Sequence, residues 1–286
     1  MQRRCQVWAV LNVTPDSFSD GGRYLDPAAA LLRAKELVRG GADVIDVGGA
    51  SSRPPGKTYG GGAEPVSLEE ELRRVVPVIQ QVVRELGARV SIDTTRPEVA
   101  RAALRAGASI VNDVSNGATE ALLQVAAEAG AELVLMHNRG DGSVTPPNSV
   151  YQDVVEEVVA ELSAAAVRAR CAGVASKDIW LDPGIGFAKT AADSLAMIAA
   201  VPQLARAGYR VLVGPSRKSF IAAVEADAGV SPQSTPLERL GGTAAAVACS
   251  VIGGADAVRV HDLQVMRQAV LVAEALFAAR GRGRRE

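Results

Sequence analysis

Aromatic residues and cysteines are scarce in this sequence of 286 residues. Aromatic side chains make up 3% of the chain and hydrophobic residues 48%, so a core has to be built mainly from alanine, valine, leucine and isoleucine. The three cysteines, Cys5, Cys171 and Cys249, are too few and too scattered for a disulfide framework or a cysteine metal site. Such sparse cysteine usage is typical of a reducing compartment, and we expect a cytoplasmic protein.

The chain also lacks an excess of charge of either sign and any long apolar run. Its 31 basic and 32 acidic residues leave a net charge of −1, which excludes electrostatic attraction as a reason to expect nucleic acid or an acidic membrane as partner. Residues 1–5 are charged and lead into a short apolar run, so neither a signal peptide nor a membrane span is expected. We therefore expect a soluble, intracellular protein.

What the sequence does contain is a repeat of short apolar segments and longer segments with helical periodicity. The apolar segments are 7–11, 44–47, 90–92, 110–111, 133–136, 179–181, 211–213 and 257–260. They are apolar almost throughout, as strands buried on both faces should be. The expected helices are 28–38, 68–86, 98–106, 119–129, 154–172, 194–207, 237–252 and 263–279.

This alternation predicts the fold class. Several expected helices end at a glycine suited to a left-handed cap: Gly40, Gly87, Gly107, Gly130, Gly173 and Gly208. Eight strand–helix units predict a parallel sheet with right-handed crossovers, which closes most simply into a (β/α)8 TIM barrel. A doubly wound open sheet is the alternative. No linker divides the chain, so residues 1–286 are expected to form a single domain with a solvated basic tail at about 280–286.

Polar residues follow the expected strands one after another, where the active site of such a barrel is built. They are Asn12, Ser52, Arg53, Asp93, Asn112, His137, Asp182, Lys218, Ser219, Arg259 and His261. Taken singly, Asp93 fits a helix N-cap, Asp182 fits a turn and His137 fits a buried neutral imidazole. Arg217 likewise fits a plain ion pair with a carboxylate. Their joint occurrence at successive strand ends favours a functional site.

The chemistry of these residues divides into two groups. One group offers carboxylate and amide oxygens to the amidine-like edge of a flat heterocycle: Asp93, Asn112 and Asp182. The other suits an anion such as a pyrophosphate: Arg53, Lys218, Arg259 and His261. Asn12 is a candidate Mg²⁺ ligand together with phosphate oxygens, and Ser219, expected in the first turn of a helix, is placed to hold a carboxylate or phosphate.

Several motifs together resemble one enzyme family. They are Asn-Val-Thr-Pro-Asp-Ser-Phe-Ser-Asp-Gly-Gly at 12–22, Asp-Val-Gly-Gly at 46–49, Ser-Ser-Arg-Pro at 51–54, Ser-Ile-Asp-Thr at 91–94, Val-Asn-Asp at 111–113, Asp-Pro-Gly-Ile-Gly-Phe at 182–187, Ser-Arg-Lys-Ser-Phe at 216–220 and Arg-Val-His-Asp at 259–262. In this order, and over roughly residues 7–275, the chain is similar to the dihydropteroate synthases. Segments 12–22 and 216–220 are the most specific, whereas segment 46–49 alone is weak.

The resemblance implies a transferase of folate biosynthesis. Such an enzyme displaces pyrophosphate from 7,8-dihydropterin-6-ylmethyl diphosphate with the amine of p-aminobenzoate, uses Mg²⁺ and forms a homodimer. The implied pterin residues are Asp93, Asn112, Asp182 and Lys218, with Arg259 stacking on the ring. The implied pyrophosphate and metal residues are Asn12, Ser52, Arg53, Arg259 and His261. Phe18, Pro54 and Ser219 would shape the p-aminobenzoate site, Phe187 would contact substrate, and Asp20 would lie near the reacting methylene.

The sequence departs from the family pattern at a few positions. Ala50 stands where a glutamate is usual, segment 55–62 is an apparent insertion, Asn138 replaces a methionine and Ala188 replaces a glycine. Three alternatives remain: a pterin-dependent methyltransferase, a non-catalytic pterin-binding relative, and a barrel acting on an unrelated sugar phosphate. The methyltransferase would not need segments 12–22 and 216–220, and the sugar-phosphate barrel would not bind pterins.

Overall fold

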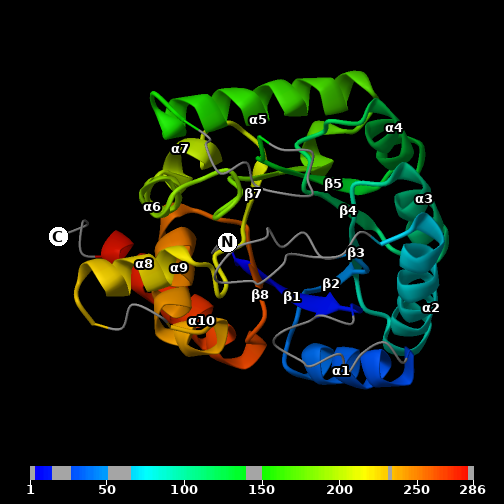
Figure 1. The fold of residues 1–286 in the computed structure, drawn as a ribbon, viewed down its shortest axis with the longest axis horizontal. Coiled ribbons are helices and arrows are strands. Elements are labelled where there is room, and N and C mark those ends of the chain that lie inside the picture. Colours follow the sequence, from blue (N-terminus) through cyan, green and yellow to red (C-terminus); the bar gives the residue numbers. More distant parts are fainter. Residues whose placement is uncertain (1–3, 15–26, 51–65, 140–149, 231–233, 283–286) are drawn as a thin grey trace.

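A closed barrel of eight parallel strands forms the centre of the molecule, surrounded by helices (Figure 1). The computed structural model describes residues 4–14, 27–50, 66–139, 150–230 and 234–282. The strands are β1 (Gln6–Asn12), β2 (Val44–Gly48), β3 (Val90–Asp93), β4 (Ile110–Asp113), β5 (Glu132–Met136), β6 (Ile179–Asp182), β7 (Arg210–Val213) and β8 (Ala257–Val260). They pair in chain order, and β8 closes the ring on β1. The predicted TIM barrel is confirmed, and the open-sheet alternative is wrong.

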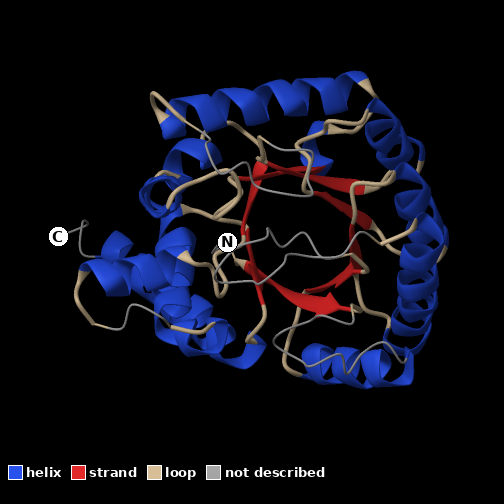
Figure 2. Ribbon diagram, viewed as in Figure 1, coloured by secondary structure: helices blue, strands red, loops and turns tan. Residues whose placement is uncertain are grey.

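The helices form an outer ring around the strands (Figure 2). They are α1 (Pro27–Arg39), α2 (Leu68–Leu86), α3 (Pro97–Arg105), α4 (Glu120–Glu128), α5 (Val154–Cys171), α6 (Ala191–Ala199), α7 (Val201–Ala205), α8 (Phe220–Asp227), α9 (Leu240–Gly253) and α10 (Leu263–Arg282). The helix expected at 194–207 is two helices that meet at Ala200, because Pro202 in the first turn of α7 has no N–H to continue α6. Helix α10 also extends into the segment expected to be a tail.

The glycine caps were predicted correctly at five of the six positions. Gly87, Gly107, Gly130, Gly173 and Gly208 all have positive φ. The exception is the end of α1, where Gly41 at φ 88° takes the left-handed conformation instead of Gly40. A Cβ on Gly40 would come within 2.9 Å of the Leu263 side chain, so close packing against α10 is the reason for a glycine there.

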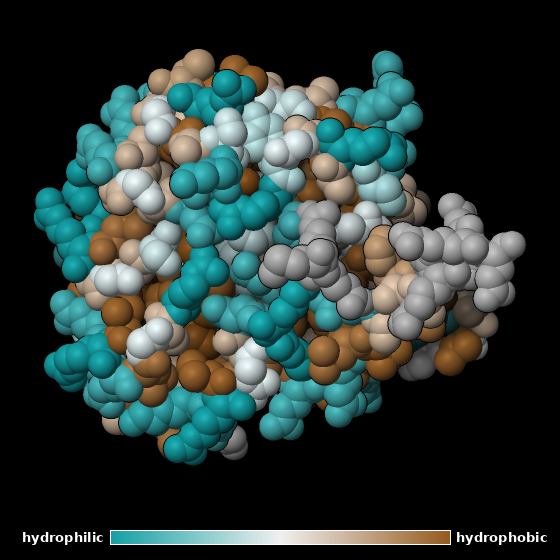
Figure 3. Space-filling model, turned by 180° about the vertical axis from the view of Figure 1, so that it is seen from behind, coloured by the Kyte–Doolittle hydropathy of each residue, from teal (hydrophilic) through white to brown (hydrophobic). Residues whose placement is uncertain are grey.

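Two tryptophans fill the barrel interior in spite of the low aromatic content. Trp8 and Trp180 are fully buried and meet edge to face with their ring centroids 5.1 Å apart. They belong to an interior cluster completed by Val44, Ile110, Val134, Leu212 and Ala257. The larger aliphatic core lies between the sheet and the helices. The outer surface opposite the view of Figure 1 mixes hydrophilic and apolar side chains (Figure 3).

Candidate active site

The polar residues of the barrel mouth lie one layer above the apolar interior cluster that contains Trp8 and Trp180. Side chains two positions apart on a strand point to the same face. The interior residues Val44, Ile110, Trp180 and Ala257 are therefore followed, two positions along and on the same face, by Asp46, Asn112, Asp182 and Arg259. Asp93 is in register with Asn112 on the neighbouring strand. Strand alternation and barrel closure thus bring together acids, an amide and a cation from separate parts of the chain.

Arg259 joins two of the acids. Its Nε lies 2.6 Å from Asp46 Oδ2, and its Nη2 lies 2.7 Å from Asp93 Oδ2. The amide of Asn112 also contacts this carboxylate, with its Nδ2 3.3 Å from Asp46 Oδ2. The two carboxylates therefore bind the edge of the guanidinium and fix the orientation of its flat face.

Asp46 is a site residue that the sequence analysis missed. It had been treated only as part of a weak Asp-Val-Gly-Gly motif, yet it is fully buried and bonds both Arg259 and Asn112. A signal was present in the sequence, because an acid in the middle of the apolar strand 44–48 has to be neutralised by a partner when it is buried.

Asp182 and Lys218 complete the described part of the mouth. Asp182 Oδ1 accepts a hydrogen bond of 2.8 Å from the backbone N–H of Gly184. Lys218 Nζ lies 4.0 Å from the centroid of the Phe187 ring. A Cβ on Gly214 would lie 3.8 Å from Arg259 Cβ and 3.9 Å from Asp182 Oδ2, so this glycine lies between the cation and the acid.

The charged groups of the mouth are held in an environment that disfavours charge. Burial raises the pKa of Asp93 to about 7, since lost hydration outweighs the attraction of Arg259 and the charge of Asp46 adds to the rise. Burial also raises the pKa of Asp182 to about 6 and lowers the pKa of Lys218 to about 8. Burial on its own would lower the pKa of Arg259 as well, but the carboxylates of Asp46 and Asp93 prevail and raise it. Such perturbed pKa values are typical of a functional site.

A buried hydrogen-bond network supports the turn after β7. Arg217, at φ 61°, pairs through Nε with Asp262 at 2.8 Å, which is the ion-pair interpretation left open by the sequence. Its carbonyl accepts a bond of 2.9 Å from buried Arg239, which sequence reasoning did not identify. Ser219 is exposed and lies at the N-cap of α8 without a side-chain cap bond, one position before the first turn in which it was expected.

Asn12 is the last residue of β1, and His261 directly follows the neighbouring strand β8. His261 Nδ1 is 3.0 Å from the hydroxyl oxygen of Ser216. Asn12 ends β1, and its Oδ1 would be 3.4 Å from a Cβ on Gly48, which also faces Asp93. Among the described residues, no group of three or more His, Cys, Asp or Glu side chains gathers in a way that could hold a metal ion.

Five predicted site residues lie outside the described part of the chain: Phe18, Asp20, Ser52, Arg53 and Pro54. The insertion at 55–62 lies outside it as well. Among the departures from the family pattern, Ala50 is exposed and Asn138 is buried. Ala188 has φ 47°, a left-handed conformation that explains why glycine is usual at this position.

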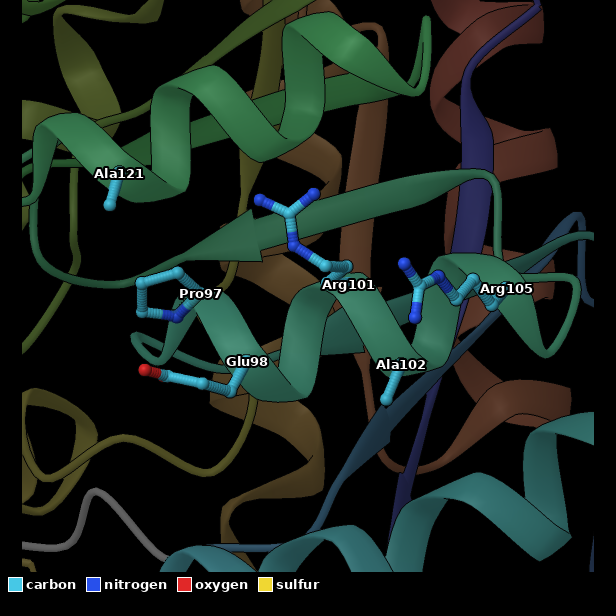
Figure 4. A pocket seen from close by; sticks show the side chains of 6 residues that line it. All are labelled: Pro97, Glu98, Arg101, Ala102, Arg105 and Ala121. Atoms are coloured by element: carbon cyan, nitrogen blue, oxygen red, sulfur yellow. The ribbon is translucent and has the colours of Figure 1, made fainter.

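A separate hollow of about 350 Å³ lies outside the barrel, between α3 and α4. Figure 4 shows its lining side chains, which are Pro97, Glu98, Arg101, Ala102, Arg105 and Ala121. Arg101 is paired with Glu128 at 2.8 Å. None of these residues belongs to the group at the strand ends, so the hollow is not the candidate active site.

Comparisons with known proteins agree with the class that the barrel and its mouth define. The family described as "Pterin binding enzyme" matches residues 8–261. The dihydropteroate synthase of Synechocystis sp. is 47% identical over 276 residues, which cover 96% of this chain and 91% of the relative. The Yersinia pestis dihydropteroate synthase in a sulfonamide drug complex superposes with a TM-score of 0.87 at 33% identity, covering 98% of this chain and 96% of that one. The Xanthomonas albilineans enzyme in complex with 7,8-dihydropteroate gives 0.81 at 36% identity, with coverages of 96% and 95%. The chain belongs to the dihydropteroate synthase family of pterin-binding enzymes.

Proposed function

We propose that this chain condenses 7,8-dihydropterin-6-ylmethyl diphosphate with p-aminobenzoate to form 7,8-dihydropteroate and pyrophosphate in folate biosynthesis. The observation that carries the proposal is that Arg259 binds both Asp46 and Asp93 at the barrel mouth. Asp182 and Lys218 lie at the same mouth, close enough for their charges to interact. Acids suited to the edge of a pterin ring and cations suited to its diphosphate therefore meet at one mouth.

The acids and the amide hold the ring. A pterin presents a ring N–H and an exocyclic amine, which together make paired hydrogen bonds to one carboxylate. Asp93, Asn112 and Asp182 are assigned to this edge, because they lie at the carboxyl ends of strands β3, β4 and β6. Arg259, held by its edge, presents its flat face to the ring, and Phe187 contacts substrate from the loop after β6.

Catalysis rests on stabilising charge as the diphosphate leaves. Lys218, Arg259 and His261, with Ser52 and Arg53, bind the leaving group, and one well-placed electrostatic donor is typically worth about 3–4 kcal/mol in the transition state. The pterin π-system spreads the charge of the methylene cation, and Asp20 stabilises it. The arylamine of p-aminobenzoate, whose site is shaped by Phe18, Pro54 and Ser219, then attacks. No covalent enzyme nucleophile is needed.

Mg²⁺ is assigned to the diphosphate rather than to a protein cage. The donor set fits this assignment, since Asn12 offers one neutral oxygen at the rim and no metal-holding cluster is found among residues 4–14, 27–50, 66–139, 150–230 and 234–282. Mg²⁺ commonly keeps several waters and binds through one or two protein groups plus substrate phosphates. When bound there it neutralises charge on the departing pyrophosphate.

We also assign the enzyme a compartment, a domain organisation and an oligomeric state. Sparse cysteine favours the cytoplasm, and no helix of the described segments is long and apolar enough to cross a membrane. We assign residues 1–286 to one domain with small-molecule substrates and no nucleic-acid or membrane partner. A homodimer is supported by exposed apolar side chains on α10, namely Leu271, Val272, Leu276 and Phe277. Sedimentation velocity tests the dimer, and a monomer at micromolar concentration would contradict it.

Calorimetric titration with the pterin diphosphate, with and without Mg²⁺, followed by a coupled turnover assay, tests the function. We expect binding and pyrophosphate release that depends on p-aminobenzoate. Lys218→Ala or Arg259→Ala should lower turnover by about two orders of magnitude with the fold retained by circular dichroism. Binding without pyrophosphate release would favour the non-catalytic relative, and no affinity for pterins would favour the unrelated barrel.

A further inference from the structure

The loop that follows β6 is held by Lys189, a residue with no role in the proposed function. Residues 183–190 carry Phe187, whose ring lies 4.0 Å from Lys218 Nζ, to the mouth. At the end of this loop, Lys189 Nζ lies 3.2 Å from the carbonyl oxygen of Phe187 and 2.8 Å from His137 Nδ1. One ammonium group therefore joins the backbone of the loop to the end of β5.

The contact continues through His137 to a carboxylate. His137 is fully buried, and its Nε2 lies 2.9 Å from Glu161 Oε2 on α5. The Glu161 carboxylate can only accept, so His137 Nε2–H donates to it and Nδ1 of the neutral imidazole accepts from Lys189. Burial lowers the pKa of His137 to about 4, and the charge of Lys189 adds to this, so the imidazole is neutral as this direction of bonding requires. Burial also lowers the pKa of Lys189 to about 7, and its amine carries hydrogens to donate in either protonation state.

Other contacts fix the far end of the chain and the sides of the loop. Arg139 binds Glu161 through Nε at 3.2 Å and stacks on the Tyr151 ring, with its Cζ 4.0 Å from the centroid. The hydroxyl of Tyr151 donates to the carbonyl oxygen of Ala188 at 2.8 Å. Glu161 thus binds Arg139 through Oε1 and accepts a hydrogen bond from His137 through Oε2.

The loop needs such an anchor because Ala188, which has a Cβ, is held in the left-handed region at φ 47°. Gly184 and Gly186 reach φ values of 66° and 76° without this cost, because glycine has no Cβ. A Cβ on Gly184 would lie 2.0 Å from the carbonyl oxygen of His137, so the loop passes directly over the residue that Lys189 binds. Unfavourable conformations of this kind persist only where the surroundings impose them.

We propose that Lys189, acting through His137 and Glu161, is a positioning residue that fixes Phe187 against Lys218 and so preorganises the pterin diphosphate site. It bonds the loop and not the substrate, so it acts on affinity more than on the chemical step. The assignment rests on the proposed function.

The decisive variant is Lys189→Met, which keeps the length of the side chain and removes its donors. We expect the KM and the calorimetric Kd for the pterin diphosphate to rise about tenfold or more, because the loop that carries Phe187 is then no longer held in place and binding has to order it as well. The kcat should change less than about threefold, because the chemical step keeps its cations. Lys189→Arg keeps a cationic donor and should recover most of the lost affinity.

Two comparison variants separate positioning from general destabilisation. Val158→Ala opens a cavity at a fully buried position on α5, the helix that carries Glu161, and removes no hydrogen bond of the loop. It should lower the melting temperature and leave Kd unchanged. In a double-mutant cycle, Lys189→Met should cost much less affinity in a Glu161→Gln background than in the wild type.

Wild-type Kd in Lys189→Met, or a loss of affinity equal to that of Val158→Ala, would overturn the inference. Additive effects of Lys189→Met and Glu161→Gln would also overturn it, since they would show that the chain does not act as a unit. Failure of the proposed function is distinguishable, because the wild-type protein itself would then not bind the pterin diphosphate.

Discussion

Replacing Asp93 by asparagine should stabilise the ligand-free protein above neutral pH while it removes the affinity for pterin. The structure holds this carboxylate 2.7 Å from Arg259, yet burial raises its pKa to about 7 from the usual 3.8. The ion pair therefore does not recover the hydration that Asp93 loses on folding. Asparagine resembles the protonated acid, keeps an oxygen for Arg259 and carries no charge to desolvate.

The size of the effect follows from proton linkage. A pKa that moves from 3.8 to about 7 corresponds to about 4 kcal/mol, at about 1.4 kcal/mol for each factor of ten in the protonation equilibrium. The Asp93 side chain is 19% exposed, and solvent screening reduces the figure to about 2 kcal/mol. Because the folded pKa lies above the unfolded one, the stabilising contribution of Asp93 is complete below pH 3.8 and is lost as the pH rises to about 7. The difference in free energy of unfolding between Asp93→Asn and the wild type should therefore grow across this pH interval and stay constant above it.

Urea denaturation at about pH 4 and about pH 8.5 measures the free energy of unfolding, and calorimetric titration measures the affinity for the pterin diphosphate. Asp43→Asn is the matched control, because Asp43 is 20% exposed and also pairs with an arginine, but at the opposite end of the barrel. We expect the control to lose stability at about pH 8.5, where Asp93→Asn gains it. An Asp93→Asn protein that is less stable than wild type at the higher pH would refute the reasoning, since the attraction of Arg259 would then exceed the cost of burial.

The remaining predictions concern other contacts of the mouth. Asp46→Asn should destabilise the protein by about 1–3 kcal/mol in urea, because the Nε of Arg259 loses a fully buried charged acceptor, and unchanged stability would mean that Asp93 alone holds the guanidinium. Gly184→Ala should cost more than about 2 kcal/mol in the same assay, because its Cβ would lie 2.0 Å from the His137 carbonyl oxygen at φ 66°, and near-normal stability would contradict the observed backbone path. Removal of Mg²⁺ with a chelator should weaken calorimetric binding of the pterin diphosphate while leaving the melting temperature unchanged, and a drop in melting temperature would indicate a structural metal instead.

The level of each strand-end residue could be read from the sequence because it depends on local regularities. Apolar runs identify the strands, and the alternation of side chains places Asn112 and Asp182 one layer above Ile110 and Trp180. The break at Ala200 was missed, since the helical periodicity of 194–207 outweighed the single proline at 202. Asp46 is not identified by its Asp-Val-Gly-Gly motif, which is weak on its own, but by its place as an acid in a fully buried strand, where it needs a partner.

The sequence by itself determined the alternation of strands and helices, the barrel class and the set of polar groups at its mouth, because periodicity and turn chemistry act over a few residues. Tertiary structure alone decided which of those groups meet: Arg259 with Asp46, 213 positions apart, and Lys189 with His137, 52 positions apart. It also decided their protonation, which depends on how much water each buried group loses. Both outcomes require the closed ring, since no local segment contains both partners or the surroundings that exclude solvent.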